Sequence, residues 1–114
     1  MSIPTREKAL VAASLERYCD LKVPAGLRER VQLDFRFEGN GITLFERRAR
    51  HQLPGQWREL PLASFRYVAG TGHWFLFWHD PEGSWHRADE TPGTADFEAL
   101  LAEVDRDPLG RFWG

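Results

Sequence analysis

The stretch RVQLDFRFEGNGITLFERR, residues 30–48, constrains the fold more than any other part of the chain. Apolar and polar residues alternate through its first half, which is the period-two pattern of a half-buried β-strand. The Gly39-Asn40-Gly41 segment then interrupts the alternation and is typical of a type I′ hairpin turn. The sequence therefore predicts an antiparallel hairpin with strands at about 30–38 and 42–49. A two-residue loop puts four apolar side chains on one face: Phe35, Phe37, Ile42 and Leu44.

A second hairpin is predicted in HWFLFWHDPEGSWHR, residues 73–87. Its DPEG segment fits a type I turn inside a three-residue loop, with Pro81 second and Gly83 in the left-handed position. In that register Asp80 opposes Ser84. One face of the hairpin then carries Phe75, Phe77, His79, Trp85 and Arg87. The other face carries Trp74, Leu76, Trp78, His86 and Ala88.

The same register bears on metal binding. His79 and His86 point to opposite faces, so we do not expect them to share a metal ion. The chain also has one cysteine, Cys19, and lacks the paired ligand spacing of zinc sites. Cys19 cannot form an intrachain disulfide and is expected to be a small buried apolar side chain. We therefore expect no metal site and no cofactor, and the aromatic residues are expected mainly to line the core.

An amphipathic helix is predicted from about residue 4 to 22. Pro4 suits its first turn and Pro24 stops it. At roughly 100° per residue, one half of the helix surface is mostly apolar. It carries Leu10, Val11, Ser14, Leu15, Tyr18, Cys19 and Leu21. Only Glu7 and Lys22 interrupt this stripe, which we expect to lie on the core.

A second helix is expected from about 95 to 107, with Thr94 as its N-cap and Pro108 after its end. Its apolar stripe consists of Phe97, Leu100, Leu101 and Val104. An apolar tail, residues 109–114, follows. We expect Phe112 and Trp113 to fold back onto the sheet, and docking of this tail on a partner is the alternative.

Further strands are expected at about 62–69, 73–79 and 84–88, joined by connections too short for parallel crossovers. Residues 1–114 then form a single domain with one helix, five strands and one helix. This order predicts an α+β fold, in which a five-stranded antiparallel meander sheet has an N-terminal and a C-terminal helix on one face.

The sequence shows no signal for a membrane or for export. No apolar run approaches the roughly 20 residues that span a bilayer. Charges interrupt the N-terminal segment, which leaves no signal-peptide core. We therefore expect a cytoplasmic protein that does not bind membranes.

Motifs for catalysis are missing as well. There is no Gly-x-Ser-x-Gly and no convincing Cys/His arrangement. The glycine pairs fall in predicted hairpin turns instead of preceding helices, unlike phosphate-binding loops. We expect a protein that is not an enzyme.

One enzyme alternative involves Asp34, Glu46 and Arg48. An acid followed by acid-x-basic on the next strand resembles the arrangement of metal-dependent nucleases with a restriction-endonuclease-like fold, in which two carboxylates hold Mg²⁺. Strand parity opposes this reading, because Asp34 falls on the opposite face from Glu46.

Glu46 and Arg48 are unusual in continuing an apolar face. Three interpretations stay open. The sheet extends past the core and both are solvated, or a β-bulge near Phe45 re-aims them, or they belong to a partly buried ion pair that involves Arg48 or Arg66.

A nucleic-acid hypothesis concerns the other face of the first hairpin. Arg36, Arg47 and Phe45 share that face, and such Arg–aromatic surfaces stack the bases of single strands. Asp34 and Glu38 dilute the patch, and the net charge of the chain is −2, which makes this the second hypothesis.

The leading hypothesis is a binding or interaction module that uses a sheet face or the C-terminal tail. Both faces of the second hairpin are apolar, and an aromatic patch without cover is typical of an interaction site. A homodimer and a protein partner are the two versions of this hypothesis. The candidate binding residues are Arg36, Phe45, Glu46, Arg47, Arg48, Arg66, Trp74, Trp78, His86, Phe112 and Trp113.

Several segments together carry a family resemblance: ITLFERR, SFRYV with HWFLFW, GSWHR, and DRDPLGRFWG. Over roughly residues 5–114 the chain resembles a family of small bacterial proteins known as a domain of unknown function, number three-thousand-and-twenty-four. The resemblance implies a stand-alone bacterial protein of the cytosol. It implies no activity, cofactor or catalytic residue.

Overall fold

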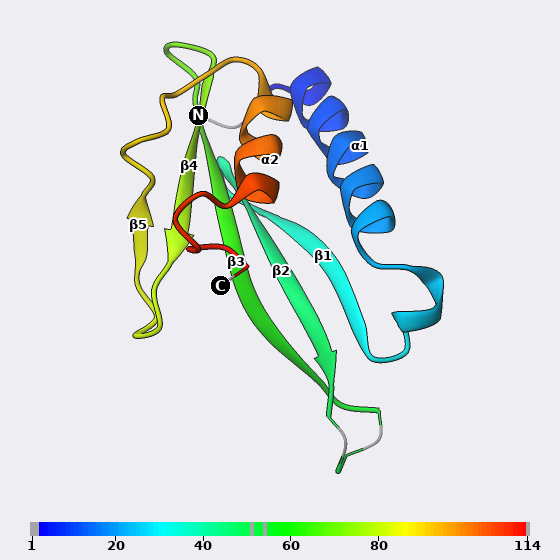
Figure 1. Ribbon diagram of the computed structural model, residues 1–114. Coiled ribbons are helices and arrows are strands. Elements are labelled where there is room, and N and C mark those ends of the chain that lie inside the picture. The colour runs from blue at the N-terminus through cyan, green and yellow to red at the C-terminus, as the bar shows by residue number, and fades with distance from the viewer. Residues whose placement is uncertain (1–2, 51, 54, 114) are drawn as a thin grey trace.

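A computed structural model describes residues 3–50, 52–53 and 55–113, and it consists of one antiparallel sheet with both helices on the same face (Figure 1). The strands pair in the order in which they occur along the chain, so the predicted α+β meander is confirmed. The elements are α1 (Thr5–Lys22), the 3-10 helix η1 (Ala25–Leu27), β1 (Val31–Glu38), β2 (Gly41–Ala49), β3 (Trp57–Val68), β4 (His73–His79), β5 (Trp85–Arg87) and α2 (Phe97–Arg106).

The β1–β2 hairpin has the predicted register, with Phe35 opposite Leu44. Its two-residue loop is Gly39-Asn40, and of these residues only Gly39 has a positive φ, of 60°. A positive φ at the first central residue alone is the mark of a type II′ turn, so the predicted type I′ turn is not formed. Both turn types have two-residue loops, which is why the register is unaffected.

Strand β3 begins at Trp57 and not at residue 62 as predicted. Its first part pairs with the end of β2 as far as Pro61, which lies opposite Phe45. The register shifts there, and Leu62 is the extra residue of a β-bulge between the two strands. A proline is tolerated at a bulge because the ladder needs no N–H from it.

The core lies between the sheet and the two helices. Trp74 is at its centre, fully buried, with the rings of Tyr67 and Phe97 at 5.0 and 5.1 Å. All four predicted apolar residues of α2 are buried. Helix α1 contributes less than predicted, because Leu10 and Leu21 are 57% and 85% exposed. Its buried residues are Val11 and Leu15.

The two charges that interrupt the apolar stripe of α1 bond to other elements. Glu7 accepts a hydrogen bond from the Trp74 indole N–H at 3.0 Å. At the other end of the helix, Lys22 donates to Asp105 of α2 at 2.6 Å. These side chains therefore fasten α1 at both ends.

The N-cap of α2 is Asp96, whose carboxylate accepts the N–H of Glu98 at 3.1 Å. The predicted cap, Thr94, lies outside the helix, where its hydroxyl accepts the N–H of Asp96 at 3.0 Å. Asp96 and Thr94 thus share the capping.

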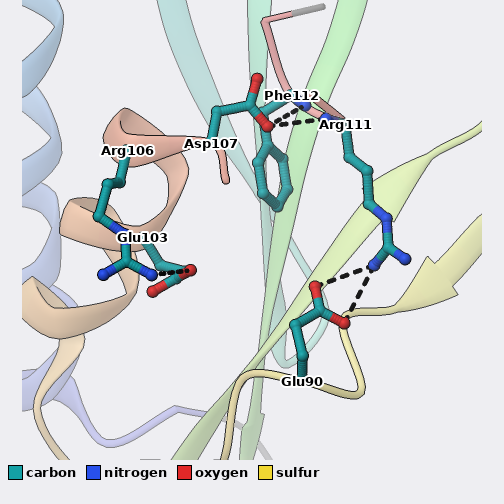
Figure 2. A network of polar contacts seen from close by, with 6 residues as sticks. All are labelled: Glu90, Glu103, Arg106, Asp107, Arg111 and Phe112. Carbon is teal, nitrogen blue, oxygen red and sulfur yellow. Dashed lines mark hydrogen bonds and ion pairs between the residues drawn. The ribbon is translucent and has the colours of Figure 1, made fainter. Parts of the chain in front are cut away.

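The C-terminal tail folds back onto the core, as the first interpretation predicted. Asp107 ends α2 with a left-handed φ of 42°, and its carboxylate accepts three backbone N–H groups of the tail. They belong to Arg111 at 2.7 Å, Phe112 at 3.1 Å and Trp113 at 2.9 Å. Figure 2 shows the first two of these contacts. Phe112 is only 8% exposed, so it is not available to a partner and the docking-tail alternative is wrong for this residue.

Candidate functional site

The face of the sheet turned away from the helices, here the open face, carries none of the helices formed by the described residues (Figure 1). Strand register places arginines and aromatic residues together on this face. The arginines are Arg36, Arg47, Arg66 and Arg87, and the aromatic residues are Phe45, Trp57, Phe75, Phe77 and Trp85. The face that the helices pack against is called the covered face below.

Each arginine of the open face lies over an aromatic ring of the adjacent strand. In every case the ring belongs to the residue two positions along from the arginine's direct partner, which is the diagonal neighbour in an antiparallel sheet. The distances from guanidinium carbon to ring centroid are 4.4 Å for Arg36 over Phe45, 5.1 Å for Arg47 over Trp57, 3.9 Å for Arg66 over Phe77 and 4.5 Å for Arg87 over Phe75.

The four arginines differ in their polar partners. Arg36 donates to both carboxylate oxygens of Glu59 at 2.8 Å, and Arg47 donates to the Gln32 amide oxygen at 3.3 Å. Arg66 and Arg87 make no side-chain hydrogen bond or ion pair with any of the described residues. Their N–H groups therefore face solvent.

The open face is concave. Trp85 of β5 lines two hollows, of about 290 and 260 Å³, together with residues of β1 and β2. The side chain of Trp85 therefore extends across the open face towards β1 and β2. Small residues, Thr43 and Ser64, lie on the floor of the second hollow.

A third hollow, of about 330 Å³, lies between Arg66 and Arg87. Phe75 and Phe77 line it, and both rings are half-buried. This hollow thus combines an apolar lining with two guanidinium groups that have no carboxylate partner among the described residues.

Of the predicted site residues, Arg36, Phe45, Arg47 and Arg66 lie on the open face. Trp74, Trp78 and His86 lie on the covered face, where the fully buried Trp74 is not accessible to a partner. The residues that the prediction missed are Trp57, Phe75, Phe77, Trp85 and Arg87. An available signal was that an arginine stands diagonally across from each of Trp57, Phe75 and Phe77.

The β4–β5 hairpin has the predicted register, with His79 opposite Trp85 and Trp78 opposite His86. The two histidines lie on opposite faces, as parity predicted. His86 stacks on Trp78 with ring centroids 4.7 Å apart, and its Nε2 lies 2.5 Å from an Asp80 carboxylate oxygen. Two hydrogen bonds hold the pKa of the Asp80 carboxyl below its usual value. The larger effect comes from the Ser84 N–H and the smaller from the His86 side chain.

Glu46 is on the covered face, 7% exposed, and forms an ion pair with Arg48. The ion-pair interpretation is confirmed with Arg48 as the partner, and the idea that both residues are solvated is wrong for Glu46. The bulge near Phe45 exists, but it does not re-aim Glu46, because pairing with β1 stays regular and leaves Glu46 opposite Leu33.

The nuclease arrangement is not assembled. Asp34 lies opposite Phe45 on the open face, whereas Glu46 is on the covered face, so the two carboxylates cannot hold one ion. Among the described residues there is no group of three histidine, cysteine, aspartate or glutamate side chains placed to hold a metal.

The remaining candidate binding residue, Trp113, packs in the same cluster as Tyr18 and Cys19 of α1. Cys19 is partly buried, and burial, followed by the charge of Asp34, raises the pKa of its thiol to about 12. Burial also raises the pKa of Tyr18, whose hydroxyl donates to Asp105 at 3.2 Å. Trp113 is half-buried next to these two residues, with the Lys22 ammonium 5.1 Å from its ring centroid.

Comparison with models of known protein families shows to which family the chain is related. A family model described as a domain of unknown function, DUF3024, matches residues 3–114. The chain belongs to the DUF3024 family. This confirms the resemblance carried by the ITLFERR, SFRYV, GSWHR and DRDPLGRFWG segments. In the DUF3024 fold the last of these segments supplies Asp107 and the tail that it holds.

Neither a curated protein nor a solved structure gives a significant match to this DUF3024 chain. None of the helices in the part of the chain that the structure describes is long and apolar enough to cross a membrane.

Proposed function

We propose that this DUF3024 chain is a non-enzymatic binding module whose open face holds an anionic partner. The observation that carries the proposal is the set of four arginine–aromatic pairs on a concave face that neither α1 nor α2 covers. A guanidinium in cation–π contact with a ring is still able to donate its N–H groups to oxygen ligands, and it is well suited to carboxylate or phosphate. The cytoplasmic and bacterial setting that the family resemblance implied stays a prediction.

Charge favours an anionic partner over a second copy of the chain. Two copies stacked through this face would bring like-charged guanidinium groups together, which is unfavourable. The face also has three carboxylates, Asp34, Glu38 and Glu59. Glu59 already pairs with Arg36, so the anion would be held best near Arg66 and Arg87.

The test is salt-dependent retention of the purified protein on heparin, a generic polyanion. We expect the double variant Arg66→Gln/Arg87→Gln to elute at lower salt than the unaltered protein. A matched variant, Arg6→Gln/Arg17→Gln, removes the same charge from exposed positions of α1 and should elute as the unaltered protein does. Equal elution of all three proteins, or no retention at low salt, would contradict the proposal.

The proposal that the protein is not an enzyme has a separate test, in which the protein is incubated with plasmid DNA and Mg²⁺ or Mn²⁺. We expect no cleavage, because Asp34 and Glu46 lie on opposite faces of the sheet. Metal-dependent cleavage that disappears in Glu46→Ala would favour the nuclease alternative instead.

A further inference from the structure

We infer that the hollow between Arg66 and Arg87 binds single-stranded nucleic acid, with a base on the guanidinium planes and phosphate at their N–H edges. This inference rests on the proposed function and names the class of partner. It extends the Arg–aromatic hypothesis from the first hairpin to β3, β4 and β5.

The stacking geometry is the first support. Arg66 crosses from β3 to lie 3.9 Å from the Phe77 centroid, and Arg87 crosses from β5 to lie 4.5 Å from the Phe75 centroid. Each guanidinium carbon lies over a ring, and both side chains are exposed, so a base can stack on the side of the group that faces away from the ring. Proteins that bind single strands stack bases on arginine planes as well as on aromatic rings.

The second support is charge. Arg66 and Arg87 are exposed, and neither has a carboxylate partner within the described residues. Arg36, in contrast, is neutralised by Glu59. A phosphate group would therefore meet two uncompensated cations in this hollow and one compensated pair towards β1.

Cross-strand register defines a row of side chains that runs across the open face, perpendicular to the strands. Arg36, Thr43, Ser64, Phe77 and Arg87 are directly opposite one another in succession, one from each strand. Four strand spacings make this row roughly 19 Å long. Such a row has a cation at each end, hydroxyl groups in the middle and an aromatic ring beside the second cation.

A single strand fits this surface better than a duplex or an acidic peptide. Bases of a duplex are stacked inside, where half-buried rings such as Phe75 and Trp85 cannot reach them. An acidic peptide would use the two arginines, but it would leave the aromatic lining of the hollow without a planar partner. Contacts of this kind tolerate any base sequence.

The experiment is fluorescence anisotropy with labelled oligo-dT of about ten nucleotides, within the site sizes of single-strand binding folds. We expect Arg66→Gln/Arg87→Gln to weaken binding about tenfold or more and Arg6→Gln/Arg17→Gln to leave it unchanged. Loss of two phosphate contacts should reduce the slope of log affinity against log salt by about 1.4. Arg66→Lys/Arg87→Lys keeps both charges and should still bind more weakly than the unaltered protein, because the planar groups are lost.

Competition with unlabelled duplex DNA and polyglutamate completes the test. We expect unlabelled oligo-dT to compete best. If heparin retention depends on Arg66 and Arg87 while oligo-dT does not bind, or if duplex or polyglutamate binds more tightly, this inference is overturned and the proposed function stands. If none of these polyanions binds at low salt, both fail. Thermal unfolding of each variant establishes that it is folded.

Discussion

The indole N–H of Trp74 donates a hydrogen bond of 3.0 Å to the carboxylate of Glu7, which joins the first turn of α1 to the centre of the sheet. Trp74 is fully buried, so loss of the acceptor leaves a buried donor without its partner. We expect Glu7→Ala to lower the free energy of unfolding by about 1–3 kcal/mol. Glu7→Gln keeps an acceptor oxygen, so its free energy of unfolding should fall by less than that of Glu7→Ala. Urea unfolding measures both, and equal stability of Glu7→Ala and the unaltered protein would show that the contact contributes nothing.

Asp107 is predicted to hold the C-terminal tail in place. Its carboxylate accepts three N–H groups, and hydrogen bonds to a charged group are worth more than neutral ones. We expect Asp107→Ala to lower the free energy of unfolding by about 2–3 kcal/mol. Asp107→Gly suits the left-handed backbone but supplies no acceptor. If Asp107→Gly unfolds at the same urea concentration as the unaltered protein, the contribution of Asp107 comes from its backbone and not from the carboxylate.

Gly93 is predicted to be required for packing. A Cβ atom at this position would lie 2.4 Å from the ring of Phe75, which must then move. We expect Gly93→Ala to lower the free energy of unfolding by about 1–3 kcal/mol, because the added methyl group overpacks this site. Movement of Phe75 would also disturb Arg87, so the variant should bind oligo-dT more weakly. Gly26→Ala is the control, because no atom lies within 4 Å of its added Cβ. A thermal midpoint for Gly93→Ala equal to that of Gly26→Ala would contradict this reading.

Cys19 is predicted to react slowly with alkylating reagents, because the thiolate is the reactive form and burial raises its pKa to about 12. At a pH of about 8.5 the folded protein should react with iodoacetamide at least about tenfold more slowly than the urea-unfolded chain, because the lower thiolate fraction outweighs the higher nucleophilicity of a thiolate of raised pKa. Folding favours the protonated thiol, so its contribution to stability is present below the unfolded pKa. That contribution is lost progressively as the pH rises from about 8.5 towards the folded value. Comparable alkylation rates in both states would contradict the raised pKa.

The sequence allowed the hairpins to be predicted down to their register. Period-two alternation placed Phe35 opposite Leu44, and the DPEG turn placed His79 opposite Trp85. The missed start of β3 has a physical cause, since the bulge at Leu62 breaks the alternation on which such predictions depend. Apolar–polar alternation therefore predicts strands well where their pairing is regular.

Contacts between residues distant in the sequence could not be predicted from such local patterns. Leu10 and Leu21 extend the apolar arc of α1, but the sheet covers only the part of that arc that includes Val11 and Leu15. Glu7 was counted as an interruption because its partner, Trp74, is distant in sequence. The faces of the second hairpin were assigned correctly, whereas which of them the helices cover depends on long-range packing.

The same reason explains the mixed result for the candidate site. Arg36, Arg47 and Phe45 could be grouped because they belong to one hairpin. Arg66 and Arg87 come from strands on either side of β4, so their shared hollow can be recognised only once the order and register of β3, β4 and β5 are known.

The five indole N–H groups offer the most direct test of the open face as the binding surface. Trp57 and Trp85 lie on that face, whereas Trp74, Trp78 and Trp113 lie on the helix side of the sheet. The measurement is a titration of the ¹⁵N-labelled protein with oligo-dT, followed through the indole resonances. We predict that the Trp85 resonance shifts most while that of Trp74 stays in place. A shift of Trp78 and Trp113 with Trp57 and Trp85 unchanged would contradict the account.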